Sequence, residues 1–210
     1  MRFYGQFDPP VDQFIFERYF PDPAIQGVFV ECGAFDGVLE CSCKFFEEQM
    51  GWQGYNLEPV PWIFASLETN RPAARNLNVG LSNKCEDALF RAVVHPRFGR
   101  ECTNGSLHHT ASHMQFLIDE GCTFEDVTVK TITWKRLVSS QGISRVDLLV
   151  LDVEGHEAAV MDGMYDCPVL PDIVCVEFGH VGLGIIKDRL EPLGYAYDTS
   201  SHANAYFVKR

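Results

Sequence analysis

Residues 28–37 read Val28-Phe29-Val30-Glu31-Cys32-Gly33-Ala34-Phe35-Asp36-Gly37, and the rest of the chain is organised around this stretch. Apolar, β-favouring residues lead into an acid and two glycines, and helix-forming residues follow at 39–50. This order predicts a buried first strand, a tight turn and a helix. Glycines in such a turn let the backbone approach a ligand closely. The third glycine of a dinucleotide fingerprint and the Gly-Lys-Ser/Thr of a phosphate loop are missing, so the turn alone does not identify the ligand.

A second acid, Glu58, narrows the choice of ligand. It ends the predicted second strand, residues 54–58, about twenty residues after the glycine turn. Because parallel neighbouring strands end at the same edge of a sheet, a carboxylate here can accept hydrogen bonds from both hydroxyls of a ribose. The pattern favours an adenosine-containing ligand without a pyrophosphate. S-adenosylmethionine fits, because its ammonium and sulfonium groups are cationic and tolerate neighbouring acids.

The rest of the chain predicts an α/β fold with a mostly parallel, doubly wound sheet and an antiparallel strand pair at its C-terminal end. Residues 1–26 are expected to form an N-terminal arm and a helix over 12–20, within one domain that spans 1–210. Further strands are predicted over 75–81, 88–94, 127–132, 146–151, 173–177, 195–199 and 204–208. Further helices are predicted over 61–70, 134–140, 158–164 and 182–193.

Residues 95–126 depart from this alternation, and only one or two helical turns are expected there, over 114–120. Long irregular segments inside a compact domain are usually functional or mobile. We expect this segment to be a lid on the acceptor side of the site. A surface excursion that merely covers the sheet edge is the alternative.

Several motifs, in this order, resemble the FkbM-type S-adenosylmethionine-dependent methyltransferases. The resemblance rests on residues 29–37, Gly51-Trp52-x-Gly54, Leu57-Glu58-Pro59-x-Pro61, Val129-Lys130-Thr131-Ile132-Thr133 and the run Asp147–Glu157, which contains Asp152-Val153-Glu154-Gly155. It covers roughly residues 28–178. The resemblance implies a class I methyltransferase (Rossmann-like) fold, in a family that usually methylates oxygen. It does not identify the methyl acceptor of this chain.

The donor would then lie on the residues that follow the first three strands. Glu31, Gly33, Ala34 and Phe35 would line the methionine moiety. Glu58 would hold the ribose, and Gly80-Leu81 would lie near the adenine. The full set of expected cofactor-binding residues is Glu31, Gly33, Ala34, Phe35, Gly37, Glu58, Pro59, Gly80, Leu81 and Asp152.

Candidate catalytic groups follow two later strands. Asp152, Glu154 and His156 come after the predicted strand 146–151, and Glu177 and His180 end the next one, so they should converge on one crevice. One of them could be the general base for a hydroxyl acceptor, or the group could bind a divalent metal that acidifies the hydroxyl. We expect a metal-independent base among Asp152, Glu154, His156 and His180. Alternatively, Glu154 and Glu157 cap the following helix.

Three histidines of the irregular segment, His108, His109 and His113, could also reach the acceptor if the segment folds back over the site. His109 and His113 are four residues apart and would share one face of a helix. Surface histidines are the simpler interpretation of each.

Composition limits the partners and the location. The formal net charge of −12 disfavours nucleic-acid binding. No signal peptide or membrane span is visible, so we expect a cytoplasmic protein without membrane contact. The eight scattered cysteines are expected to be buried free thiols, because paired zinc-knuckle spacings are absent. The oligomeric state is left open.

These features favour S-adenosylmethionine-dependent O-methylation of a small hydroxylated metabolite or sugar. A non-catalytic module that binds an adenosine ligand is one alternative. A nucleotide-dependent oxidoreductase is another, and the missing third glycine argues against it.

Overall fold

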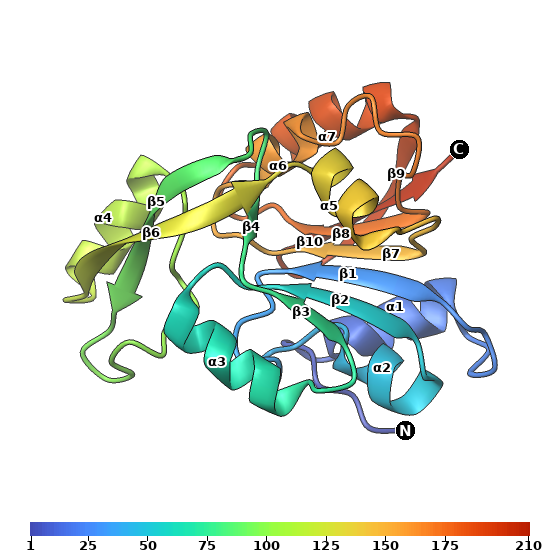
Figure 1. Ribbon diagram of the computed structural model, residues 1–210, viewed down its shortest axis with the longest axis horizontal. Coiled ribbons are helices and arrows are strands. Elements are labelled where there is room, and N and C mark those ends of the chain that lie inside the picture. The colour runs from blue at the N-terminus through green and yellow to red at the C-terminus, as the bar shows by residue number, and fades with distance from the viewer.

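The computed structural model describes residues 1–210 and is built around a seven-stranded sheet with strand order β3-β2-β1-β7-β8-β10-β9 (Figure 1). The strands of this sheet are β1 (Val28–Cys32), β2 (Gln53–Leu57), β3 (Arg75–Leu77), β7 (Leu148–Leu151), β8 (Ile173–Glu177), β9 (Tyr195–Ser201) and β10 (Asn204–Lys209). Strands β3, β2, β1, β7 and β8 are parallel, and β10 runs antiparallel to both β8 and β9. The predicted mostly parallel, doubly wound α/β sheet with an antiparallel C-terminal pair is confirmed.

Helices cover both faces of the sheet. They are α1 (Val11–Tyr19), α2 (Lys44–Met50), α3 (Pro61–Asn70), α5 (Trp134–Gln141), α6 (Glu157–Asp162), α7 (Leu183–Leu190) and the 3₁₀ turn η1 (Glu191–Leu193). The larger core joins α5, α6 and α7 to one face, and a second core joins α1 and α2 to the other. The central strand β7 is buried along its whole length, as its continuous apolar run predicts. None of the helices has the length and apolar character needed to span a bilayer.

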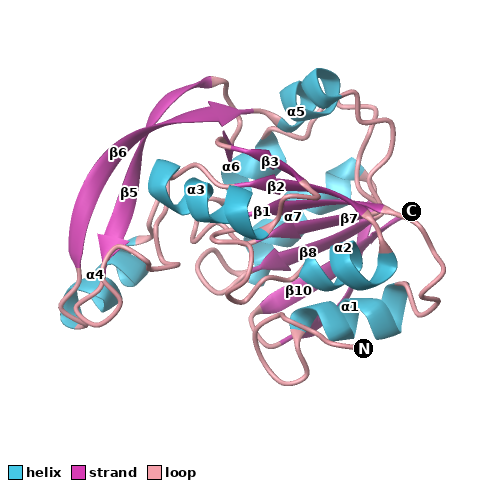
Figure 2. Cartoon of the chain, turned by 60° about the horizontal axis from the view of Figure 1, so that its bottom comes forward, coloured by secondary structure: helices cyan, strands magenta, loops and turns pink.

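Between β3 and β7 the chain leaves the main sheet and forms a projecting arm (Figure 2). A three-stranded sheet runs through it, with β6 (Thr123–Ile132) between β4 (Gly80–Leu81) and β5 (Glu86–Val94). The helix α4 (Ala111–Asp119) lies at the far end of this arm. The segment 95–126 is therefore more regular than its sequence suggests, because β5 and β6 pair from Glu86↔Thr131 to Val94↔Thr123.

The helix expected over 39–50 begins only at Lys44, and the cause is Glu31. Its buried carboxylate accepts hydrogen bonds from the backbone N–H groups of Ser42 (2.8 Å) and Cys43 (3.0 Å). Asp36 likewise accepts two backbone hydrogen bonds at 2.8 Å, which keeps the preceding residues in turns. Because these backbone N–H groups bond to side chains of the first strand and its turn, residues 39–43 do not form the first turns of the predicted helix.

The third predicted strand, 75–81, is divided into β3 and β4, which belong to different sheets. The division lies at Asn78, whose side-chain amide donates to the backbone carbonyls of Glu58 (2.9 Å) and Pro59 (3.0 Å). The chain therefore turns across the end of β2 instead of continuing along it. The remaining predicted elements differ from the structure by a few residues at their ends, and α3 and β8 coincide with their predictions.

Gly33 brings the ends of β1 and β7 close together. Its φ of +80° is in the left-handed region, and a Cβ atom there would lie 1.9 Å from the backbone oxygen of Asp152. The position thus needs glycine for backbone packing as well as for its conformation. The expectation that a side chain at 33 would first meet the ligand is corrected, because it would first meet Asp152.

We predict that Gly33→Ala destabilises the protein by a few kcal/mol, on the order of 1–3 for the strained backbone alone. Gly184→Ala in α7 is the matched control, because no atom lies within 4 Å of its added Cβ and its φ is not positive. Urea unfolding monitored by circular dichroism gives both values. Equal stability of the two variants would contradict the tight contact between Gly33 and Asp152.

A buried charge network lies behind the glycine turn. Arg71 at the end of α3 is 1% exposed, and its guanidinium lies 2.7 Å from Glu47, 2.8 Å from the Cys41 sulfur and 3.7 Å from Glu31. Burial raises the pKa of Glu31, and the nearby guanidinium opposes that rise. Removing one member of such a network leaves a buried charge without compensation.

Arg71→Ala should therefore lower the free energy of unfolding by about 3–5 kcal/mol. Arg136→Ala, an exposed arginine of α5, should change it by less than about 0.5 kcal/mol. The midpoints of urea denaturation measure both effects. A loss for Arg71→Ala no larger than that of its control would mean that the network does not stabilise the fold.

Candidate active site

A cavity lies at the carboxyl ends of the parallel strands. Residues that follow β1, β2, β7 and β8 line it, as does the short strand β4. The projecting arm supplies the segment Cys102–Gly105 and Arg100, and the N-terminal arm supplies Gln6 and Phe7. The cavity thus occupies the edge where ligands bind in open α/β sheets.

Seven of the ten expected donor residues line this cavity, and three do not. Those in the lining are Gly33, Phe35, Glu58, Pro59, Gly80, Leu81 and Asp152. Glu31 turns away to the loop 41–43, and a Cβ on Gly37 would meet the side chains of Arg71 and Leu67 of α3. Ala34 is buried outside the lining. The structure therefore places these three residues behind the glycine turn.

Glu58 is 5% exposed, and one of its carboxylate oxygens accepts a hydrogen bond from the backbone N–H of Val60 at 2.8 Å. The carboxyl group also lines the cavity, beside Phe35 of the glycine turn. Burial raises the pKa of Glu58 to about 8, and the backbone hydrogen bonds only partly offset that effect. A ligand that donates hydrogen bonds to this carboxylate would favour its ionised form.

Two acids, Asp152 and Glu177, face each other on the cavity wall after β7 and β8. Asp152 keeps accessible surface because it lines the cavity, but protein surrounds it on all other sides. Burial, together with the charge of its neighbouring acids, raises the pKa of both carboxyl groups. Such a pair retains one proton more readily than two isolated carboxylates would.

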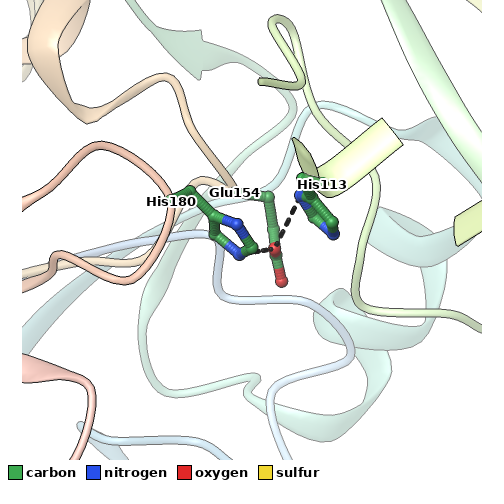
Figure 3. A group of neighbouring side chains, drawn as sticks. All are labelled: His113, Glu154 and His180. Carbon is green, nitrogen blue, oxygen red and sulfur yellow. Dashed lines mark ion pairs between the residues drawn. The ribbon is translucent and has the colours of Figure 1, made fainter. Parts of the chain in front are cut away.

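Glu154 lies beside this pair at a turn with a φ of +55°. One carboxylate oxygen, Oε2, is 2.8 Å from His180 Nε2 and 3.7 Å from His113 Nδ1 (Figure 3). The other oxygen, Oε1, accepts a hydrogen bond from the Asn104 side chain at 3.4 Å. The ion pair with Glu154 raises the pKa of His180, whereas burial, reinforced by His180, lowers the pKa of His113 to about 4.

The convergence expected for Asp152, Glu154, Glu177 and His180 is present, whereas His156 points elsewhere. His156 lines the cavity, but its Nε2 lies 3.0 Å from the hydroxyl of Ser82, next to β4. Burial lowers the pKa of His156 to about 4. Glu157 accepts hydrogen bonds from the backbone N–H groups of Val153 (3.2 Å) and Gly155 (3.1 Å), so it holds the turn that precedes α6.

Of the three histidines in the projecting arm, only His113 reaches the acid cluster. Its ring stacks on that of His180 with centroids 3.9 Å apart. His109 Nε2 is 2.7 Å from the backbone oxygen of Asn104, and His108 is exposed. Asn104 is not among the expected site residues; the only signal for the segment Cys102–Gly105 is its place in the irregular stretch 95–126.

Gly155 explains how the arm is held against the site. A Cβ atom at this glycine would lie 2.8 Å from the backbone oxygen of His108. The Ser106 hydroxyl also donates to the carbonyl of Val153 at 3.1 Å. The base of the arm therefore packs directly on the Asp152–Gly155 turn and positions His113 and Asn104.

Comparison with known proteins agrees with this arrangement. No curated protein matches the chain. The FkbM methyltransferase from Methylobacillus flagellatus KT has a similar structure over 90% of this chain, with 12% sequence identity and a TM-score of 0.55. The METTL16 methyltransferase domain is similar over 96% of the chain, with 8% identity and a TM-score of 0.52. This chain spans 46% of the first structure and 66% of the second, and at these identities the likeness concerns the fold.

The sequence itself matches the family model described as the methyltransferase FkbM domain, over residues 31–197. The matched region contains the glycine turn, Glu58 and the acid cluster after β7 and β8. It covers most of the chain. The protein therefore belongs to the FkbM methyltransferase family.

Proposed function

We propose that this protein transfers the methyl group of S-adenosylmethionine to a hydroxyl group of a small molecule. The observation that carries this proposal is a single cavity whose two walls are lined by chemically different residues. One wall consists of the donor residues Gly33, Glu58 and Gly80, and the other consists of the acid–histidine cluster. Methyl transfer needs donor and acceptor side by side, away from water, with a base within reach of the acceptor.

The residues present fit the donor that the family implies. Glu58 lines the cavity, where its carboxylate can accept hydrogen bonds from ribose hydroxyls, and the carboxyl group of Asp152 lies beside the glycine turn, where it suits a cationic ligand. When bound, S-adenosylmethionine supplies a methyl group that an oxygen nucleophile can attack in line with the departing sulfur. Gly80 and Leu81 would lie against the adenine, and Phe35 against the methionine portion.

The acceptor side would bind a neutral or cationic molecule. Four carboxyl groups line the cavity (Glu58, Asp152, Glu154 and Glu177). The one arginine in the lining, Arg100, pairs with Glu125 at 2.6 Å. A polyanion would meet repulsion here, which agrees with the net charge of −12. This electrostatic environment supports a hydroxylated metabolite or sugar as the acceptor class.

As the new carbon–oxygen bond forms, the acceptor hydroxyl must lose its proton. Asp152 and Glu177 are placed to receive it, because both line the cavity between the donor turn and His180. Glu154 and His180 would orient the acceptor oxygen. His156, which contacts Ser82, would act on the donor side instead. We propose that the segment Cys102–Gly105 closes the acceptor half of the site, as the expected lid.

We predict that S-adenosylhomocysteine binds, and that its affinity depends on the ionisation of Glu58. Because the pKa of Glu58 is about 8 without ligand and ribose hydroxyls donate to the carboxylate, binding releases a proton below pH 8. The affinity should therefore fall by up to about tenfold for each pH unit below 8. Calorimetry between pH 6 and 8 measures this slope.

Glu58→Gln should weaken binding at pH 8 by about 1–3 kcal/mol and flatten the slope. Glu68→Gln, an exposed acid of α3, is the matched control and should behave as the unmodified protein does. Binding that is independent of pH in the unmodified protein would remove Glu58 from the ribose site. No binding of S-adenosylhomocysteine at any pH would overturn the proposed function.

Methyl transfer itself is tested with isotopically labelled donor and a panel of hydroxylated metabolites and sugars. We expect a labelled methyl ether and an equivalent of S-adenosylhomocysteine. Asp152→Asn should lower kcat by about 10²–10⁴-fold while the protein stays folded. Asp87→Asn, an exposed acid of β5, is the control and should retain activity. Donor binding without turnover on any acceptor would favour a non-catalytic binding module instead.

A further inference from the structure

Three side chains from distant parts of the sequence meet at the acceptor end of the cavity (Figure 3). They are His113 from α4, Glu154 after β7 and His180 after β8. Their ligand-type atoms, His113 Nδ1, a Glu154 carboxylate oxygen and His180 Nε2, all lie within 4.8 Å of one another. We propose that these three residues bind a divalent transition-metal ion, in place of the metal-independent chemistry expected from the sequence.

The first argument is that the atoms facing one another lack partners. His113 is 5% exposed, and its Nδ1 has no hydrogen-bond partner. Glu154 Oε2 is likewise buried, and its one close partner is His180 Nε2 at 2.8 Å. A buried polar atom without a partner is costly. A metal ion between these atoms would satisfy all three at once.

The second argument is the size of the gap. Metal–nitrogen and metal–oxygen bonds of about 2.0–2.2 Å place neighbouring ligand atoms of a tetrahedral site roughly 3.3–3.6 Å apart. Glu154 Oε2 is 2.8 Å from His180 Nε2 and 3.7 Å from His113 Nδ1. The rings of His113 and His180 stack with an angle of 15° between their planes, so they must turn out of this stack to direct both nitrogen atoms at one ion.

Neighbouring groups hold the ligands in place. The side-chain amide of Asn104 donates to the second oxygen of Glu154 at 3.4 Å, and the backbone oxygen of Asn104 is 2.7 Å from His109 Nε2. Such outer contacts usually orient metal ligands and are needed for full affinity.

The ligand types indicate the class of metal. Two imidazoles and one carboxylate suit Zn²⁺, Fe²⁺, Co²⁺ or Mn²⁺, whereas Mg²⁺ and Ca²⁺ prefer sets made of oxygen. Three protein ligands leave coordination positions open, as in catalytic metal sites. Glu154 and His180 line the cavity, whereas His113 lies outside the lining, so an open position faces the ligand. Glu177 Oε2, 3.7 Å from His180 Nε2 and without a hydrogen bond, is a further ligand within reach.

This placement assigns the metal a role in the proposed methyl transfer, and only this step rests on the proposed function. An acceptor hydroxyl bound at the open position would lose its proton more easily, because the cation stabilises the alkoxide. The proton would pass to Asp152 or Glu177, and the acceptor oxygen would form a bond to the methyl carbon while the carbon–sulfur bond of the donor breaks and S-adenosylhomocysteine leaves. The metal would also offset the repulsion among the clustered acids.

The test measures metal binding on the whole protein and does not need an acceptor. After chelation and gel filtration, the protein is titrated with Co²⁺ and observed by visible absorption, and Zn²⁺ affinity is measured by competition. We expect one equivalent of Co²⁺ per chain, with the absorption of a site bound by nitrogen and oxygen, and displacement by Zn²⁺. His113→Ala, His180→Ala and Glu154→Ala should each weaken binding at least a hundredfold.

His108→Ala is the matched control, because this histidine belongs to the same arm but is exposed. Circular dichroism checks that each variant is folded, and His180→Ala, in a partly exposed loop, guards against misfolding of the buried His113→Ala. Loss of binding in the control, binding that persists in the three ligand variants, or no Co²⁺ binding by the unmodified protein would overturn the proposal. A thiolate-to-cobalt absorption band would also overturn it, because it would assign the metal to cysteine.

Failure of this proposal is distinguishable from failure of the proposed function. S-adenosylhomocysteine binding and its dependence on Glu58 are measured on the metal-free protein. If that binding is present and no metal binds, the methyl-transfer proposal stands with a carboxylate as the sole base. If the metal binds and S-adenosylhomocysteine does not, the metal site stands and the methyl-transfer proposal falls.

Discussion

The backbone contact between Gly33 and the carbonyl oxygen of Asp152 is the constraint on which the site depends. This contact packs the turn after β1 against the turn after β7. Position 33 therefore has no room for a side chain. Because parallel strands end at one edge of the sheet, Glu58 and Glu177 reach the same cavity from the strands on either side. The donor wall and the acid cluster are therefore two sides of one backbone junction.

The second requirement is that the projecting arm folds back on this junction. The pairing of β5 with β6 fixes the direction of the arm, and Gly155 lets its base pack on the Asp152–Gly155 turn. This packing places His113 and Asn104 against Glu154. In the proposed function, the arm contributes to the acceptor half of the cavity and the sheet to the donor half. Under that proposal, a change in the arm would alter the acceptor while leaving donor binding intact.

The distribution of buried charge separates structural from chemical roles. Behind the glycine turn, Arg71 pairs with Glu31 and Glu47 and offsets part of their charge within the fold. In the cavity, Glu154 pairs only with His180, and burial raises the pKa of Asp152 and of Glu177. A cationic donor, a metal ion or protons would stabilise such an acidic pocket. Glu31, although it precedes the glycine turn, is unavailable to a ligand because it accepts hydrogen bonds from the loop 41–43.

The sequence by itself determined the class of fold, the order of its strands and helices and the part of the site that follows β1, β2, β7 and β8. These features depend on local periodicity and on the rule that parallel strands end together, so Gly33, Glu58, Asp152 and His180 could be placed in advance. Only the tertiary structure decided that Glu31 serves the loop 41–43, that α2 starts at Lys44 and that the strand over 75–81 divides. It also decided that His113, and not His108 or His109, meets Glu154 and His180. Each of these outcomes rests on contacts between residues far apart in the chain, whose geometry no local pattern encodes.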